Sequence, residues 1–124
     1  MFSYRHAFHA GSHADILKHL TLIHLVSYLQ EKPVALTMVD THAGAGIYNL
    51  QDGFAAVSKE AEGGIFRLLK YQEAGNPIPE SIQKYLDCIQ SENSSGEMNA
   101  YPGSPFILAR MLRPQDRLKL FELH

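Results

Sequence analysis

Residues 39–46 read VDTHAGAG, and an apolar run leads directly into them. Such a run is typical of a buried strand in a parallel sheet, and an acid followed by two spaced glycines is typical of the loop after such a strand. Because Gly44 and Gly46 have no side chains, backbone N–H groups of the loop can approach a bound molecule closely. The stretch therefore predicts an α/β fold with a strand over residues 34–40. A ligand-binding loop, here called the glycine loop, follows over residues 41–46.

A helix is expected before this strand. Ser12 is suited to cap it, and Asp15 stands three residues later in the capping-box relation, with a charge that favours a helix N-terminus. Apolar residues then recur on nearly every face, which is typical of a helix packed on a sheet. Pro33 stops the pattern before the strand begins. His24 lies among leucines and is expected to be a buried structural histidine.

A second strand is expected over residues 117–123, and residues 41–116 separate it from the first. A β-α-β crossover needs only about a dozen residues, so the excess length indicates an insertion. Helical spacing predicts two inserted helices, over residues 59–73 and 79–91. The tyrosines expected to pack within this insertion are Tyr48, Tyr71 and Tyr85.

The chain then divides into three parts. Residues 1–53 hold the first helix, first strand and glycine loop, residues 54–98 form a helical subdomain, and residues 99–124 return to the sheet. A third helix is expected to begin at Ser104 as its cap, with Pro105 in the first turn. Two parallel strands do not make a stable open sheet, so the fold is expected to be incomplete, with its C-terminal strands missing from this chain.

Composition narrows the class of protein. A chain of 124 residues, 45% hydrophobic, is one globular domain or part of one. The net charge of −2 argues against a general nucleic-acid coat. Cys88 is the sole cysteine, and no signal peptide or membrane-spanning run is evident, so a cytoplasmic protein is expected. Five of the seven histidines fall within the first 24 residues and make that segment locally cationic, which suits an anionic ligand or a phosphate.

The strand ends suggest a nucleoside-like ligand. Parallel strands present their carboxyl ends at one crevice, so Glu122 is expected close to the glycine loop. A carboxylate at that place can accept hydrogen bonds from both hydroxyls of a ribose. NAD fits the acid, but the third small residue of the dinucleotide fingerprint is missing after Gly44 and Gly46. No Gly-Lys-Ser/Thr occurs, which excludes a phosphate-binding P-loop.

Four motifs together resemble the RlmJ family, which methylates the exocyclic N6 of an adenine in 23S ribosomal RNA. They are YRH with HAGSHADILKH within residues 4–19, DTHAGAG at 40–46, YPGSP at 101–105 and ELH at 122–124. The motifs follow one another in the family's order from one end of the chain to the other. The resemblance implies a Rossmann-like fold that uses S-adenosylmethionine and carries a small helical insertion.

The resemblance also implies a role for each matching residue. Lys18 and His19 would hold the methionine carboxylate of the cofactor, since a cation suits an anion. Glu122 would hold the ribose hydroxyls. The other cofactor-binding positions are His42, Gly44, Gly46 and Ser104, and the residues expected to meet the RNA are Tyr4, Arg5 and His6.

One motif of such enzymes is absent from this chain. N6-adenine methyltransferases carry an acid-Pro-Pro-aromatic motif near the fourth strand, whereas none of the six prolines here adjoins another. The catalytic acid is therefore expected outside residues 1–124, and this chain alone is expected to be inactive. The intact enzyme is expected to act on 23S ribosomal RNA as a monomer, without a metal and away from membranes.

Other interpretations stay open at this point. Lys18 and His19 fit the solvated face of a packed helix, and Asp40 fits a role in ordering the loop. His9 and His13 have the spacing of metal ligands only if both are helical. The chain as a whole fits a non-catalytic RNA-binding module of the same fold or a histidine-rich metal protein. The arginines that fit either an RNA phosphate contact or a plain exposed helix face are Arg110 and Arg113.

Overall fold

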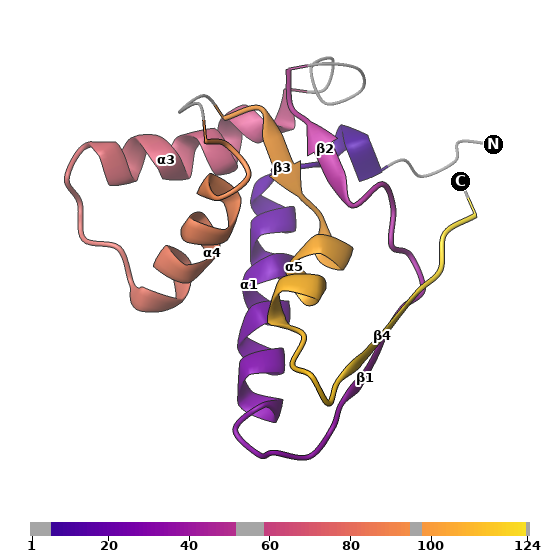
Figure 1. Ribbon diagram of the computed structural model, residues 1–124. Helices are drawn as coiled ribbons and strands as arrows, with labels where there is room; N and C mark the ends of the chain where they lie inside the picture. The colour runs from indigo at the N-terminus through magenta and orange to yellow at the C-terminus, as the bar shows by residue number, and fades with distance from the viewer. Residues whose placement is uncertain (1–5, 52–58, 95–97, 124) are drawn as a thin grey trace.

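The computed structural model describes residues 6–51, 59–94 and 98–123. Its longest element is α1, His13–Leu29, which runs through the middle of the molecule (Figure 1). Ser12 caps this helix, because its hydroxyl accepts the Asp15 N–H at 3.2 Å. The Asp15 carboxylate in turn accepts from Gly11 N–H at 3.1 Å. The predicted helix start is confirmed, although Asp15 closes the cap on Gly11 and not on Ser12 itself.

The prediction that His24 is buried is wrong. His24 shares one face of α1 with Leu17, Thr21 and Tyr28, all of which are exposed. The opposite face, which carries His19 and buried Val26, packs against the rest of the protein. A leucine-rich helix has no clear apolar stripe, so the sequence pattern did not show which face would be covered.

The two predicted strands pair in parallel. Strand β1, Thr37–Asp40, lies beside β4, Arg117–Leu120, with Thr37 opposite Arg117 and Asp40 opposite Leu120. Both strands are shorter than expected from the apolar runs. Together with the helices they make a mixed α/β fold.

Side-chain hydrogen bonds explain why β1 starts late. The Arg113 guanidinium donates to the carbonyls of Lys32 and Val34, at 2.8 and 2.9 Å, and Asp116 accepts from Leu36 N–H at 2.9 Å. The backbone at Lys32 and Val34 is therefore held by Arg113, and the first bond to β4 is made by the Leu36 carbonyl, which accepts from Arg117 N–H at 2.8 Å. Arg113, which had fitted either RNA or solvent, is a structural residue.

A second, antiparallel strand pair was not predicted. Strand β2, Ile47–Asn49, follows the glycine loop directly and pairs with β3, Ala100–Pro102. Strands of three residues beside Gly46 and Pro102 look like loops in sequence, so their pairing was missed. The pair brings both ends of the inserted segment together (Figure 1).

The insertion contains a 3₁₀ turn, η2 at Glu60–Gly63, and two helices, α3 at Ile65–Glu73 and α4 at Glu80–Gln90. Both predicted helices are confirmed, but the first is interrupted at Gly64. A Cβ built on Gly64 would overlap Gly11 O, and Ile65 N–H donates to that same carbonyl at 2.8 Å. The backbone at Gly64 thus rests directly on the start of α1.

Helix α5, Ser104–Met111, packs against α1 and against the β1–β4 pair. Its cap is Gly103, so the prediction that Ser104 caps the helix is wrong. The core lies between α1, the insertion, β3 and α5. Fully buried core side chains include Ile65, Tyr85, Leu86, Ile89, Tyr101 and Ile107. The strand pair is less covered, since Val39 is 54% exposed and Leu120 is 48% exposed.

Candidate cofactor and RNA site

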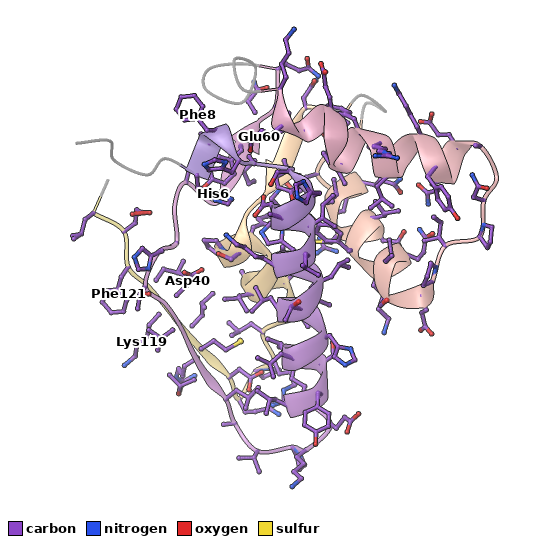
Figure 2. All side chains as sticks on the ribbon, turned by 180° about the vertical axis from the view of Figure 1, so that it is seen from behind. His6, Phe8, Asp40, Glu60, Lys119 and Phe121 are labelled. Carbon is purple, nitrogen blue, oxygen red and sulfur yellow. The ribbon has the colours of Figure 1, made fainter. Side chains whose placement is uncertain are left out.

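The carboxyl ends of β1 and β4 meet, as the parallel register requires. Beyond the paired residues, Phe121 N–H donates to Asp40 O at 2.9 Å, and Phe121 O accepts from Ala43 N–H at 3.1 Å. These bonds bring Glu122 against the glycine loop, where Gly44 N–H donates to Glu122 Oε2 at 2.6 Å. Figure 2 shows Asp40 and Phe121 next to each other at this end of the strands. The acid and the glycine loop therefore lie together as predicted.

The backbone of the loop requires both glycines. Gly44 has φ +69° and Gly46 has φ +83°, a region that side chains disfavour. A Cβ on Gly44 would also overlap the Tyr48 hydroxyl and lie 3.9 Å from Glu122 Oε2. The loop reaches this close approach to Tyr48 and Glu122 only because Gly44 has no side chain.

Asp40 orders the loop. Its Oδ1 accepts from His42 N–H at 3.1 Å, and its Oδ2 accepts from the Ser104 hydroxyl at 2.6 Å. Ser104 therefore ties the start of α5 to the end of β1. His42 is exposed, with its Nδ1 2.9 Å from the Thr41 hydroxyl. The interpretation of Asp40 as a loop-ordering residue agrees with both contacts.

A second group of polar residues is buried at the start of α1. Asp15 Oδ1 lies 3.1 Å from His6 Nε2 and 3.4 Å from His19 Nε2. His19 Nδ1 lies 3.0 Å from the Tyr85 hydroxyl and 3.1 Å from the Tyr101 hydroxyl, and the two hydroxyls are hydrogen-bonded to each other. Because Tyr85 belongs to α4 and Tyr101 to β3, this cluster joins α1 to the insertion.

Burial and the contacts within this cluster shift the pKa values of its members. Burial lowers the pKa of His19, and the attraction of Asp15 offsets this only in part. Burial acts to raise the pKa of Asp15, but the His6 hydrogen bond and the charges of His19 and His6 outweigh it, so the pKa of Asp15 lies below its usual range. Burial also raises the pKa of Tyr85 and of Tyr101. An ionised carboxylate thus stands next to a neutral imidazole near pH 7.

Lys18 and His19 have different surroundings. His19 is 4% exposed, whereas the Lys18 side chain is exposed and lines a hollow of about 580 Å³ together with His6, Asp15 and Lys59. The interpretation that both residues lie on a solvated helix face is therefore correct for Lys18 and wrong for His19. Figure 2 shows His6 and Glu60, which also lines this hollow, at the same end of α1.

Tyr48 lies between the hollow and the glycine loop. Its ring meets the His6 ring edge-on, with centroids 5.3 Å apart, and its hydroxyl accepts from Ala45 N–H at 3.4 Å. Tyr48 is 8% exposed, so it packs as predicted, but it packs on His6 and on the glycine loop and not only within the insertion. Sequence reasoning missed this role because it depends on β2, which was not predicted.

The structure thus collects the predicted residues in two places. His42, Gly44, Gly46, Ser104 and Glu122 surround the ends of β1 and β4. Lys18, His19 and His6 lie at the start of α1, on the other side of Tyr48. Tyr4 and Arg5 lie outside the described residues.

Neither a metal centre nor a membrane span is found in the part of the chain that the structure describes. There, no three His, Cys, Asp or Glu residues are grouped so as to hold a metal ion, and His9 Nδ1 lies 2.8 Å from Glu60 Oε2. Among the same residues, no helix has the length and apolar character needed to cross a membrane.

The comparisons with known proteins agree with this architecture. Residues 32–124 match the family described as Ribosomal RNA large subunit methyltransferase D, RlmJ. The chain belongs to the RlmJ family. A crystal structure of a Legionella pneumophila protein of family DUF519 superposes with a TM-score of 0.81 at 38% identity. The match covers 93% of this chain and 40% of that one.

Two curated relatives extend the match to the first residue. Ribosomal RNA large subunit methyltransferase J of Escherichia coli K12 is 42% identical over 124 residues. The Haemophilus influenzae protein of the same name is 42% identical over 125 residues. Both alignments cover this whole chain but only 43% of each relative, so the chain spans less than half the length of these RlmJ proteins.

Proposed function

We propose that the protein carrying this chain transfers a methyl group from S-adenosylmethionine to N6 of an adenine in 23S ribosomal RNA. We further propose that its methyltransferase domain is Rossmann-like, with strands beyond the β1–β4 pair and residues 54–98 as its helical subdomain. The observation that carries the proposal is the contact between the Glu122 carboxylate and the glycine loop at the joined strand ends. Membership of a family of ribosomal RNA methyltransferases supports the reaction.

Glu122 suits the ribose of the cofactor. Its Oε2 accepts the Gly44 N–H, and its Oε1 accepts the Leu123 N–H at 3.1 Å. A carboxylate oxygen accepts about two hydrogen bonds, so each oxygen retains capacity for one ribose hydroxyl. The two backbone donors hold the carboxylate in place before the cofactor arrives. His42, Gly46 and Ser104 lie at the same joined strand ends and complete the proposed set.

The methionine end of the cofactor is assigned to the start of α1. Lys18 supplies an exposed cation there, which suits a carboxylate. His19 is buried and neutral, so it serves this end chiefly by holding Asp15 and the first turns of α1. Tyr48 spans the distance between this end and the glycine loop. S-adenosylmethionine would lie along that line and supply the electrophilic methyl group.

The target adenine is assigned to the hollow beside Lys18. His6 lines the hollow, and Tyr4 and Arg5 precede it in sequence. The exocyclic amine of adenine is a poor nucleophile because its lone pair is delocalised into the ring, so hydrogen-bond acceptors must be placed against it. Residues 1–124 hold no acid-Pro-Pro-aromatic motif for this purpose. The acid is therefore proposed to come from the remainder of the protein. The whole enzyme is proposed to act in the cytoplasm as a monomer and without a metal.

Nucleoside mass spectrometry of large-subunit RNA tests the reaction. In a strain that lacks the gene, one N6-methyladenosine should be missing, and the full-length gene should restore it. An unchanged set of methylated adenines would contradict the proposal. If the protein still bound the RNA, that outcome would favour a non-catalytic RNA-binding module.

A further inference from the structure

A second, smaller hollow lies between α1 and the inserted helix α3. Its volume is about 290 Å³, close to the lower range of ligand sites. Half-buried Ile16, Leu68 and Ile82 give it an apolar lining. Arg67 and Tyr71 line it as exposed side chains. Tyr71 was expected to pack within the insertion, but 48% of it is exposed.

This groove continues the hollow beside Lys18, because His13 and Gly63 line both. The Gly64 backbone, which rests on the start of α1, also lines the groove. The two hollows therefore share a rigid boundary. A molecule that passes His13 and Gly63 would contact both hollows.

The charge along both hollows suits a polyanion. Asp15 faces His6, and Glu60 faces His9, so each of these acids has a histidine partner. By contrast, Lys18, Lys59 and Arg67 form no ion pair with any residue in the described ranges. The two hollows together are thus lined by three cations without an ion pair among the described residues and by two acids whose carboxylates already contact a histidine.

We propose that this groove binds a nucleotide of the substrate RNA that flanks the target adenine, with its base against Tyr71 and a phosphate beside Arg67. Arg67 and Tyr71 stand four residues apart on α3 and so are neighbours on one helix face. Aromatic side chains bind unpaired bases by stacking, and arginine binds phosphate through charge-assisted hydrogen bonds. The apolar lining supports one face of a base. The inference rests on the proposed function and assigns the insertion a part in holding RNA.

Paired variants of the full-length protein separate the two contacts. Stacking losses correspond to roughly 5- to 150-fold in affinity, so Tyr71→Ala should raise the Kd for transcribed large-subunit RNA within that range. Tyr71→Phe keeps the ring and should stay near wild type. Arg67→Gln should weaken binding and reduce the slope of log Kd against log salt by about one. The matched controls are Tyr28→Ala, an exposed tyrosine at the far end of α1, and Lys70→Gln, an exposed cation on α3.

Two readouts distinguish this inference from the proposed function. All variants should keep the wild-type affinity for S-adenosylmethionine and a wild-type circular dichroism spectrum. If wild type methylates the RNA but Tyr71→Ala and Arg67→Gln bind it as wild type does, the groove proposal is overturned and the proposed function stands. The groove proposal is equally overturned if the controls lose as much affinity as the groove variants. If wild type methylates no adenine, the proposed function itself fails.

Discussion

At the scale of single residues, Asp15 connects the cap of α1 with the candidate RNA hollow. Its Oδ2 accepts from Gly11 N–H, and its Oδ1 lies near both His6 and His19. The sequence predicted only the helix-capping part of this role, because the spacing of Ser12 and Asp15 is a local signal. The contact with His6 depends on how the N-terminal segment folds back, which no local pattern encodes.

Glu122→Gln should weaken the binding of S-adenosylmethionine without unfolding the protein. The change removes a charge-assisted acceptor, which typically costs about 1.5–3 kcal/mol, or roughly 10- to 150-fold in Kd. Calorimetry on the full-length protein measures the effect. Glu73→Gln, an exposed acid on α3, is the control and should bind as wild type does. Equal affinity in both variants would remove Glu122 from the site.

His19 should titrate below its ordinary value of 6.5, because burial disfavours the imidazolium form. As the pH falls, His19 takes up a proton in the unfolded chain before it does so in the folded protein. The contribution of His19 to the free energy of unfolding is therefore present above pH 6.5 and is lost as the pH falls from there through the lowered pKa. Asp15→Asn should lower the pKa further, since it removes the charge that opposes the shift. An NMR titration of the histidine ring checks both expectations. A midpoint above 6.5 would show that Asp15 outweighs burial.

At the scale of elements, the sequence predicted the helices and strands whose apolar residues recur at regular spacing. Helices α1, α3 and α4 and strands β1 and β4 follow from apolar spacing and from capping and breaking residues, and they are confirmed. The β2–β3 pair was missed because three-residue strands carry no period. The break at Gly64 was missed because its cause, the carbonyl of Gly11, lies far away in sequence.

Gly64→Ala should destabilise the protein. The added methyl would overlap the backbone at Gly11, Ser12 and His13, which cannot move aside as a flexible side chain does. Overpacking of this kind costs about 1–3 kcal/mol in the free energy of unfolding. The adjacent Gly63→Ala is the control, because nothing lies within 4 Å of its Cβ position. Urea unfolding compares the two, and equal stability would show that the α1–α3 junction is not tightly packed.

At the scale of the whole molecule, the candidate site is partly predictable. Strand ends and glycines are enough to place Glu122 beside the glycine loop, because parallel strands bring their carboxyl ends together. The link through Tyr48 and the separation of Lys18 from His19 were not predictable. They arise from packing between the insertion and α1, which side-chain periodicity in one helix does not resolve.

The 124-residue chain by itself should show no methyl transfer. It holds the proposed ribose and methionine contacts, but its sequence lacks the acid-Pro-Pro-aromatic motif that would activate the amine. Its strand pair also leaves Val39 and Leu120 exposed, as is Phe121 directly after β4, which favours association. Labelled S-adenosylmethionine and unmodified ribosomal RNA measure the activity, with the full-length protein as the positive control. Turnover comparable to that control would place the catalytic groups within these residues.

A crystal structure of the full-length protein with S-adenosylhomocysteine would locate the cofactor directly. We predict density for the ribose at the joined ends of β1 and β4, with its hydroxyls within hydrogen-bond distance of the Glu122 carboxylate. The amino-acid end should extend past Tyr48 toward Lys18. Density for the nucleoside elsewhere, with none beside Glu122 and the glycine loop, would contradict the proposed cofactor site.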